Sequence, residues 1–197
     1  MYSQTANFIV REDSHGIHEL SIPALLSADG RIFLNGPIDS ESVGAIIRKM
    51  IYLTDNNIPI RLYIDSTGGE VRAGLALIDT MDLLSKKTDI DLICIGKAYS
   101  MAAVILATGK KGHRFMLPHS ELMIHEPLLT HGAGGSASSV KTTAETLIAM
   151  RDTLSLLLSQ HTGKTVDELN AAMGFDNYMN AQEAIDFGFV DAIAIHL

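Results

Sequence analysis

Short runs of β-branched and aliphatic residues alternate along this chain with longer segments whose apolar residues recur every three or four positions. The short runs predict strands at residues 31–34, 60–64, 91–95, 113–116, 121–124 and 192–195. The longer segments predict helices at residues 41–55, 71–84, 101–108, 140–160, 165–173 and 181–187. Because strands that alternate with helices are typical of α/β folds, the pattern predicts one α/β domain with a helical extension.

The longest predicted helix, 140–160, has the features of an extension rather than of a core helix. It follows a stretch rich in glycine and serine, residues 132–139, which we expect to be a loop. An apolar stripe runs along it, formed by Val140, Ala144, Leu147, Leu154 and Leu158. An apolar face on an extension needs a surface to cover it, so we expect this stripe to contact a partner.

Composition narrows the class of protein. With 47% hydrophobic and 19% charged residues, the 197-residue chain has enough apolar side chains for a globular core. A formal net charge of −8 argues against nucleic-acid binding through a general basic surface. The single cysteine excludes an internal disulfide, which suits a reducing compartment. No segment has the pattern of a signal peptide or a membrane span, so we expect a cytoplasmic protein.

Ser100 is the first candidate for chemistry. It follows a predicted strand and the flexible Gly96, and it begins an apolar helix. Backbone N–H groups at a helix N-terminus favour negative charge nearby, and a sharp strand-to-helix turn exposes the serine of a nucleophile elbow. Serine is also a common helix N-cap, so the residue alone leaves both interpretations open.

A serine nucleophile needs a general base, and His125 is the best placed of the eight histidines. It ends the apolar run 122–124 and precedes Glu126-Pro127, which predicts a position at the rim of a strand end. The alternative is a partly buried histidine whose nitrogens are satisfied by the backbone.

Two further features bear on the same chemistry. Gly68-Gly69 lies between a predicted strand and a predicted helix, where backbone amides can approach a substrate and form an oxyanion hole. An ordinary glycine turn is the alternative.

Cys94 is a rival nucleophile, but its place between Ile93 and Ile95 predicts a buried, inert thiol.

Together, in this order, these motifs resemble the proteolytic subunits of Clp proteases (the ClpP family). GKAYSMAA (96–103) is similar to the family's nucleophile segment and MIHEP (123–127) to its histidine segment. YIDSTGG (63–69) is similar to its oxyanion loop, and AQEAIDFGFVD (181–191) resembles its C-terminal part. The resemblance extends from about residue 31 to residue 195.

The resemblance implies a role for five residues. Ser100 would be the nucleophile, His125 the general base and Asp176 the carboxylate that orients the histidine. The backbone N–H groups of Gly69 and Met101 would form the oxyanion hole. The implied fold is a single α/β domain over residues 1–197, ClpP/crotonase-like, built of repeated β-β-α units. Residues 128–162 would be a protruding helical handle and residues 1–30 an N-terminal axial segment.

The resemblance also implies an activity and partners. A Clp proteolytic subunit is a serine endopeptidase that cleaves unfolded polypeptides delivered by a hexameric AAA+ unfoldase of the ClpX, ClpA or ClpC type. Its seven-membered rings stack through the handles into a tetradecamer. No cofactor is expected, since the unfoldase uses the ATP, and no metal, nucleic acid or membrane is expected either.

Several residues depart from the family pattern. Thr67 stands where proline is usual, and Glu126 where glutamine is usual. Phe175 and Asn177 flank Asp176 where charged residues that couple the two rings are common. The departures leave an alternative open, a divergent ring subunit that is inactive or regulatory alone and needs a paralogous partner. An acyl-CoA enzyme of the same fold is less consistent, because it needs no serine nucleophile.

Overall fold

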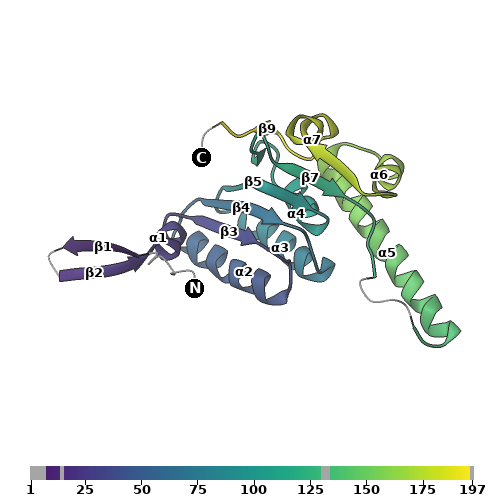
Figure 1. Cartoon of the computed structure of the whole chain (residues 1–197), viewed down its shortest axis with the longest axis horizontal. Helices are drawn as coiled ribbons and strands as arrows, with labels where there is room; N and C mark the ends of the chain where they lie inside the picture. The colour runs from purple at the N-terminus through teal and green to yellow at the C-terminus, as the bar shows by residue number, and fades with distance from the viewer. Residues whose placement is uncertain (1–7, 14–15, 130–133, 196–197) are drawn as a thin grey trace, which may run out of the picture.

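The computed structural model describes residues 8–13, 16–129 and 134–195, which form an α/β fold around a mostly parallel sheet (Figure 1). The main strands follow the spatial order β3-β4-β5-β6-β9, and all neighbouring pairs in this row are parallel. Their bounds are Arg31–Asn35 (β3), Ile60–Ser66 (β4), Ile90–Tyr99 (β5), Arg114–Met116 (β6) and Ala192–Ile193 (β9).

β5 is long enough to pair with two strands in succession. Its first half pairs with β6, and its last residues, from Lys97 to Tyr99, pair in parallel with β7 (Glu121–Ile124). β8 (Asn177–Asn180) then adds to β7 in the antiparallel sense. The carboxyl ends of β5 and β7 therefore lie side by side, and the chain leaves them at Ser100 and His125.

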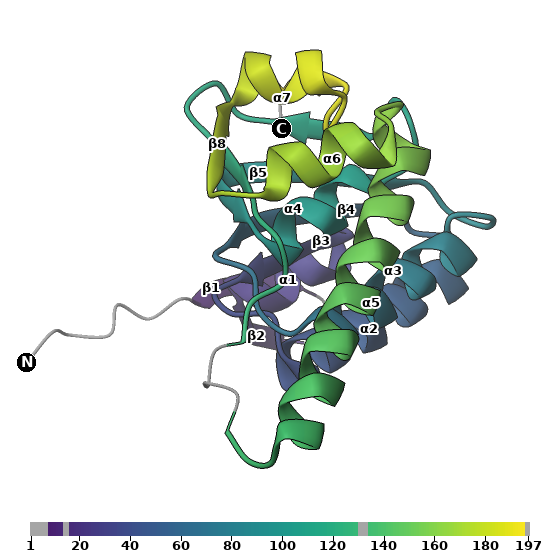
Figure 2. The same cartoon turned by 90° about the vertical axis from the view of Figure 1, so that its right-hand side faces the viewer.

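Three helices pack along the sheet: α2 (Ser40–Asp55), α3 (Val71–Leu84) and α4 (Met101–Ala107). All seven residues of α4 are buried, so packing fixes the helix that follows Ser100. Helix α5 (Ala137–Thr162) projects beyond the sheet, and α6 (Val166–Met173) and α7 (Ala181–Phe187) lie near its C-terminal end (Figure 2). At the other side, a hairpin of β1 (Phe8–Asp13) and β2 (Gly16–Ser21) leads into α1 (Ile22–Ala28).

Most predicted elements are confirmed, and helix 71–84 has the predicted bounds. The strand predicted at 91–95 was cut too short, because Gly96 marks an irregularity and not an end. There the register shifts from Ile64↔Cys94 to Ser66↔Ala98, and a Cβ on Gly96 would lie 2.7 Å from Asp65 Oδ1. The last strand is shorter than predicted, and β1, β2, α1 and β8 were not predicted at all.

Two expectations about the long helix were wrong. Residues 137–139 belong to α5 and not to a loop, because Ser136 caps the helix by accepting a hydrogen bond from the Ser139 N–H. Residues 132 and 133 lie outside the described residues. The apolar stripe is also divided, since Leu154 and Leu158 are buried in the chain's own core whereas Val140 is exposed. Apolar side chains exposed to solvent occur in both halves of the helix, at Val140, Ile148 and Leu156.

Candidate active site

Ser100 occupies the junction between β5 and α4 in a conformation that few residues adopt. Its φ of 53° and ψ of −122° place a non-glycine residue at positive φ, a strain typical of functional sites. The side chain makes no capping hydrogen bond to α4, so Ser100 is not an ordinary N-cap serine. Instead the turn has the strand-to-helix geometry of a nucleophile elbow, which presents the hydroxyl outward.

The hydroxyl of Ser100 lies within hydrogen-bond distance of the His125 ring. Nε2 of His125 lies 2.8 Å from Ser100 Oγ, and Nδ1 lies 3.2 Å from Oδ1 of Asp176. A neutral imidazole that donates its Nδ1–H to the carboxylate keeps Nε2 as an acceptor for the serine proton. The His125 side chain is 16% exposed and that of Asp176 is 57% exposed, so the imidazole is sheltered while the carboxylate is open to solvent.

Strand β8 brings Asp176 to this place. The register Ile124↔Asn177 sets Asp176 beside His125, because each is the residue adjoining a member of that pair. A second contact holds the same segments together, since the Glu126 N–H donates to the Met173 carbonyl over 2.9 Å. Reasoning from the residues alone did not find Asp176, which came only from the resemblance. The strand β8 is only four residues long, and its sequence, Asn-Tyr-Met-Asn, does not alternate strictly, so no local signal marked it.

The glycine pair forms a loop that lies against Ser100. Gly68 and Gly69 have φ of 90° and 153°, and a Cβ on Gly68 would lie 2.8 Å from Ser100 Cβ and 3.0 Å from Met101 N. Ile38 holds the loop from both sides, because its N–H donates to Gly68 O (2.9 Å) and its carbonyl accepts from Glu70 N–H (2.7 Å). This pair is therefore more than an ordinary turn, since its backbone approaches the candidate nucleophile.

Two backbone donors near Ser100 have no backbone partner among the described residues. The Met101 N–H is in the first turn of α4, where amides have no partner within the helix. Within the described residues, the Gly69 N–H donates to no other backbone group.

Beside Ser100 and His125 a small cavity of about 20 Å³ has a mainly apolar lining, formed by Val71, Met101, Val104, Ile124, Pro127, Leu154, Leu158 and Met173. Such surroundings strengthen electrostatic interactions with developing charge.

Cys94 lies apart from this chemistry. It is fully buried in β5, and burial raises the pKa of its thiol to about 11. A thiol that stays protonated at neutral pH is a poor nucleophile, which agrees with the prediction of an inert core cysteine.

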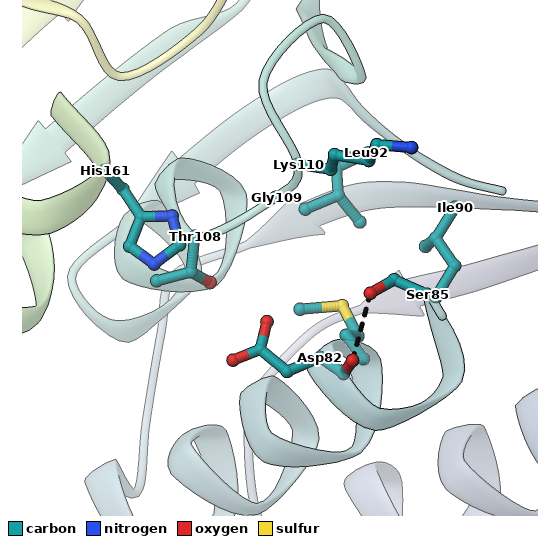
Figure 3. A pocket seen from close by; sticks show the side chains of 9 residues that line it. Asp82, Ser85, Ile90, Leu92, Thr108, Gly109, Lys110 and His161 are labelled. Carbon is teal, nitrogen blue, oxygen red and sulfur yellow. Dashed lines mark hydrogen bonds between the residues drawn. The ribbon is translucent and has the colours of Figure 1, made fainter. Parts of the chain in front are cut away.

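A larger cavity, of about 220 Å³, lies at the opposite end of α4 (Figure 3). Two of its polar groups have partners within the chain: the Thr108 hydroxyl donates to Ile105 O, and the Ser85 hydroxyl donates to Asp82 O. Burial lowers the pKa of His161 on its wall, which favours the neutral imidazole. The described residues hold no cluster of three or more His, Cys, Asp or Glu that could bind a metal.

Known proteins match nearly the whole chain. The Clp protease family matches residues 14–196. ATP-dependent Clp protease proteolytic subunits of Streptococcus pneumoniae strains Hungary19A-6, CGSP14 and ATCC 700669 are each 36% identical over 187 residues, covering 94% of this chain and 94% of the relative. The chain therefore belongs to the Clp protease family and is a peptidase of the Clp type. In the part of the chain that the structure describes, no helix is both long and apolar enough to span a membrane.

Proposed function

We propose that this chain is a serine endopeptidase that cleaves unfolded polypeptides, with Ser100 as nucleophile, His125 as general base and Asp176 as the orienting carboxylate. The observation that carries the proposal is the continuous chain of contacts from Asp176 through His125 to Ser100, at 3.2 and 2.8 Å. Segments far apart in sequence converge on it, and a strained serine is held within reach of an imidazole.

The steps of the reaction follow from this geometry. Ser100 Oγ attacks the peptide carbonyl carbon while His125 Nε2 takes the hydroxyl proton, and Asp176 stabilises the imidazolium that forms. The oxyanion accepts hydrogen bonds from the N–H groups of Gly69 and Met101. Breakdown of the tetrahedral intermediate releases the amine, which receives its proton from His125, and leaves an acyl-enzyme. Water activated by His125 then hydrolyses the ester and restores Ser100.

We further propose that the chain works in closed rings paired through α5, with an ATP-dependent AAA+ unfoldase delivering the substrate. The relatives' name includes ATP dependence, yet the chain's own mechanism needs neither nucleotide nor metal. Exposed apolar side chains along α5, at Val140 (41% exposed), Ile148 (51% exposed) and Leu156 (56% exposed), support a helix-mediated contact between copies. Enclosure would protect cytoplasmic proteins from a peptidase with low sequence specificity.

The decisive experiment is covalent labelling with a serine-reactive phosphonate, read as intact mass. We expect one adduct per chain on the wild type and on the control Ser85→Ala, and none on Ser100→Ala. Adduct on Ser100→Ala would exclude Ser100 as the nucleophile. A wild type that folds but takes no phosphonate and cleaves no peptide until a paralogous subunit is added would favour the regulatory ring subunit.

A further inference from the structure

A cluster of Tyr99, Glu121 and Tyr178 connects the three strands that carry the candidate triad. Tyr99 is the last residue of β5 and precedes Ser100. Glu121 begins β7, the strand that ends just before His125, and Tyr178 lies in β8, which follows Asp176. We propose that Tyr99, supported by Glu121 and Tyr178, is a positioning residue that keeps these strands in register for catalysis. The inference rests on the proposed function.

The sheet register places the three side chains on one face. Met123 is paired with both Tyr99 on β5 and Tyr178 on β8, so the two tyrosines stand on either side of it. Residues paired directly across strands point to the same face of a sheet. The aromatic rings meet edge to face, with centroids 5.7 Å apart and an interplanar angle of 89°. This contact joins the segment before the nucleophile to the segment after the orienting carboxylate.

The phenol adds a polar link between β5 and β7. The Tyr99 hydroxyl donates a hydrogen bond to Glu121 Oε1. This hydrogen bond raises the pKa of Tyr99 to about 12, so the phenol remains a donor throughout the neutral range. A hydrogen bond to an ionised carboxylate is stronger than one between neutral groups. Tyr99 therefore contacts both neighbouring segments, one through its ring and the other through its hydroxyl.

Two members of the triad depend on neighbouring strands for their position. Ser100 is strained at positive φ and persists there only if its surroundings hold it. The Asp176 side chain is 57% exposed, so the position of β8 sets its distance from His125 more than packing does. A small shift between β5 and β8 would lengthen the contacts of His125, and misplacement of about 1 Å costs on the order of 10²-fold in rate.

Removal of the hydroxyl alone tests the inference. We expect Tyr99→Phe to lower kcat about tenfold with KM unchanged, because substrate contacts stay while the triad loosens. Tyr178→Phe is the matched control: its hydroxyl makes no hydrogen bond among the described residues, so its kcat should stay within about twofold of wild type. Glu121→Ala should match Tyr99→Phe, whereas Glu121→Gln, which keeps an acceptor, should restore most of the activity.

The double variant Tyr99→Phe/Glu121→Ala should be no slower than either single variant, since both remove one interaction. Wild-type kcat in both single variants would overturn the inference, as would equal losses in Glu121→Gln and Glu121→Ala. If Tyr99→Phe fails to fold, the two Glu121 variants decide the question alone. Ser100→Ala, measured in parallel, distinguishes failure of the proposed function from failure of the positioning role. An active Ser100→Ala refutes the proposed function. An inactive Ser100→Ala together with a fully active Tyr99→Phe refutes only the positioning role.

Discussion

The backbone N–H of Ser100 donates a hydrogen bond to the carbonyl oxygen of Met123 over 2.8 Å. This bond continues the β5–β7 ladder by one residue, because Tyr99 is already paired with Met123. It ties the candidate nucleophile to the strand that leads into His125, so the two side chains come from strand ends that are held together. The distance between Ser100 and His125 is thus a property of the sheet more than of either loop.

Replacement of Ser100 by alanine should abolish peptide cleavage without unfolding the protein. We expect kcat to fall by about 10³-fold or more, because the members of a triad act as a unit. Fluorogenic peptide turnover measures the loss, and far-UV circular dichroism checks the fold. Retention of more than about a tenth of wild-type activity would contradict the assignment.

Acidification should reduce kcat through the imidazole of His125. A general base accepts a proton only in its neutral form, so protonation at Nε2 blocks the transfer from Ser100. We expect kcat to decrease as the assay is made more acidic than neutral. Circular dichroism over the same range must show an intact fold, and a flat activity profile would remove His125 as the base.

Gly68→Ala should impair catalysis more than a matched glycine substitution elsewhere. Gly68 (φ 90°) and Gly163 (φ 78°) are both at positive φ, so alanine at either position costs about 1–2 kcal/mol of backbone strain. Only at Gly68 would the added Cβ clash, lying 2.6 Å from Tyr99 O and 2.8 Å from Ser100 Cβ. We expect the melting temperature of Gly68→Ala to be similar to that of Gly163→Ala or somewhat lower. Only Gly68→Ala should lose kcat. Equal kcat values would show that the loop is not part of the site.

The buried ion pair between Arg114 and Asp191 should make stability depend on pH at the acid end. Burial alone would raise the pKa of Asp191, but the hydrogen bonds and charge of Arg114, 2.6 Å away, lower that pKa below its ordinary value overall. A lowered pKa contributes stability above the unfolded-state value, and that contribution is lost as the pH falls through the folded-state value. We therefore expect wild type to lose this part of its stability below about pH 4.

Asp191→Asn should cost about 3 kcal/mol at neutral pH, because the 3% exposed Arg114 side chain would keep its charge without a carboxylate. The loss should shrink toward acid pH. Asp89→Asn is the control, since Asp89 and Lys110 form an exposed pair at 3.8 Å whose loss should cost less than about 1 kcal/mol. Urea unfolding at pH 7 and pH 3 measures both, and equal losses in the two variants would contradict the prediction.

Assembly should depend on the exposed apolar side chains of α5. We expect Val140→Glu and Ile148→Glu together to convert stacked rings into single rings with little activity, because a charge on an apolar contact surface opposes association. Lys141→Glu is the control on the same helix, and sedimentation velocity is the measurement. Leu154 and Leu158 are unsuitable for this test, since charges at these core positions would unfold the domain. A wild type that sediments as a monomer at every concentration would contradict the ring model.

The strength of the contact between two rings is a separate prediction. Phe175 is 89% exposed beside Asp176, where the resemblance leads one to expect a charge. We expect the contact between rings to be weaker than is usual in the family, so that single rings appear on dilution. Sedimentation of the wild type over a range of concentrations measures this, and an undissociated tetradecamer at the lowest concentration would refute it.

The sequence by itself determined the elements whose signals are local. Helical spacing from Val71 to Leu84 and the apolar run before His125 are one-dimensional patterns, and the structure has helix α3 and strand β7 at those places. The local order of strand, serine and apolar helix also pointed to Ser100 as a candidate. Its role as an N-cap or as a nucleophile stayed open, because both interpretations use the same residues.

Only the tertiary structure decided which distant segments meet. β8 is four residues long and forms by pairing with β7, so no local pattern marked it, yet it sets Asp176 3.2 Å from His125. β5 continues past Gly96 because β7 supplies hydrogen bonds to its last residues. The same holds for α5, where Leu158 and Ile148 are both apolar but only the former is covered by the chain's own core. Burial depends on what packs against a side chain, and that neighbour is fixed by the fold and not by the adjacent sequence.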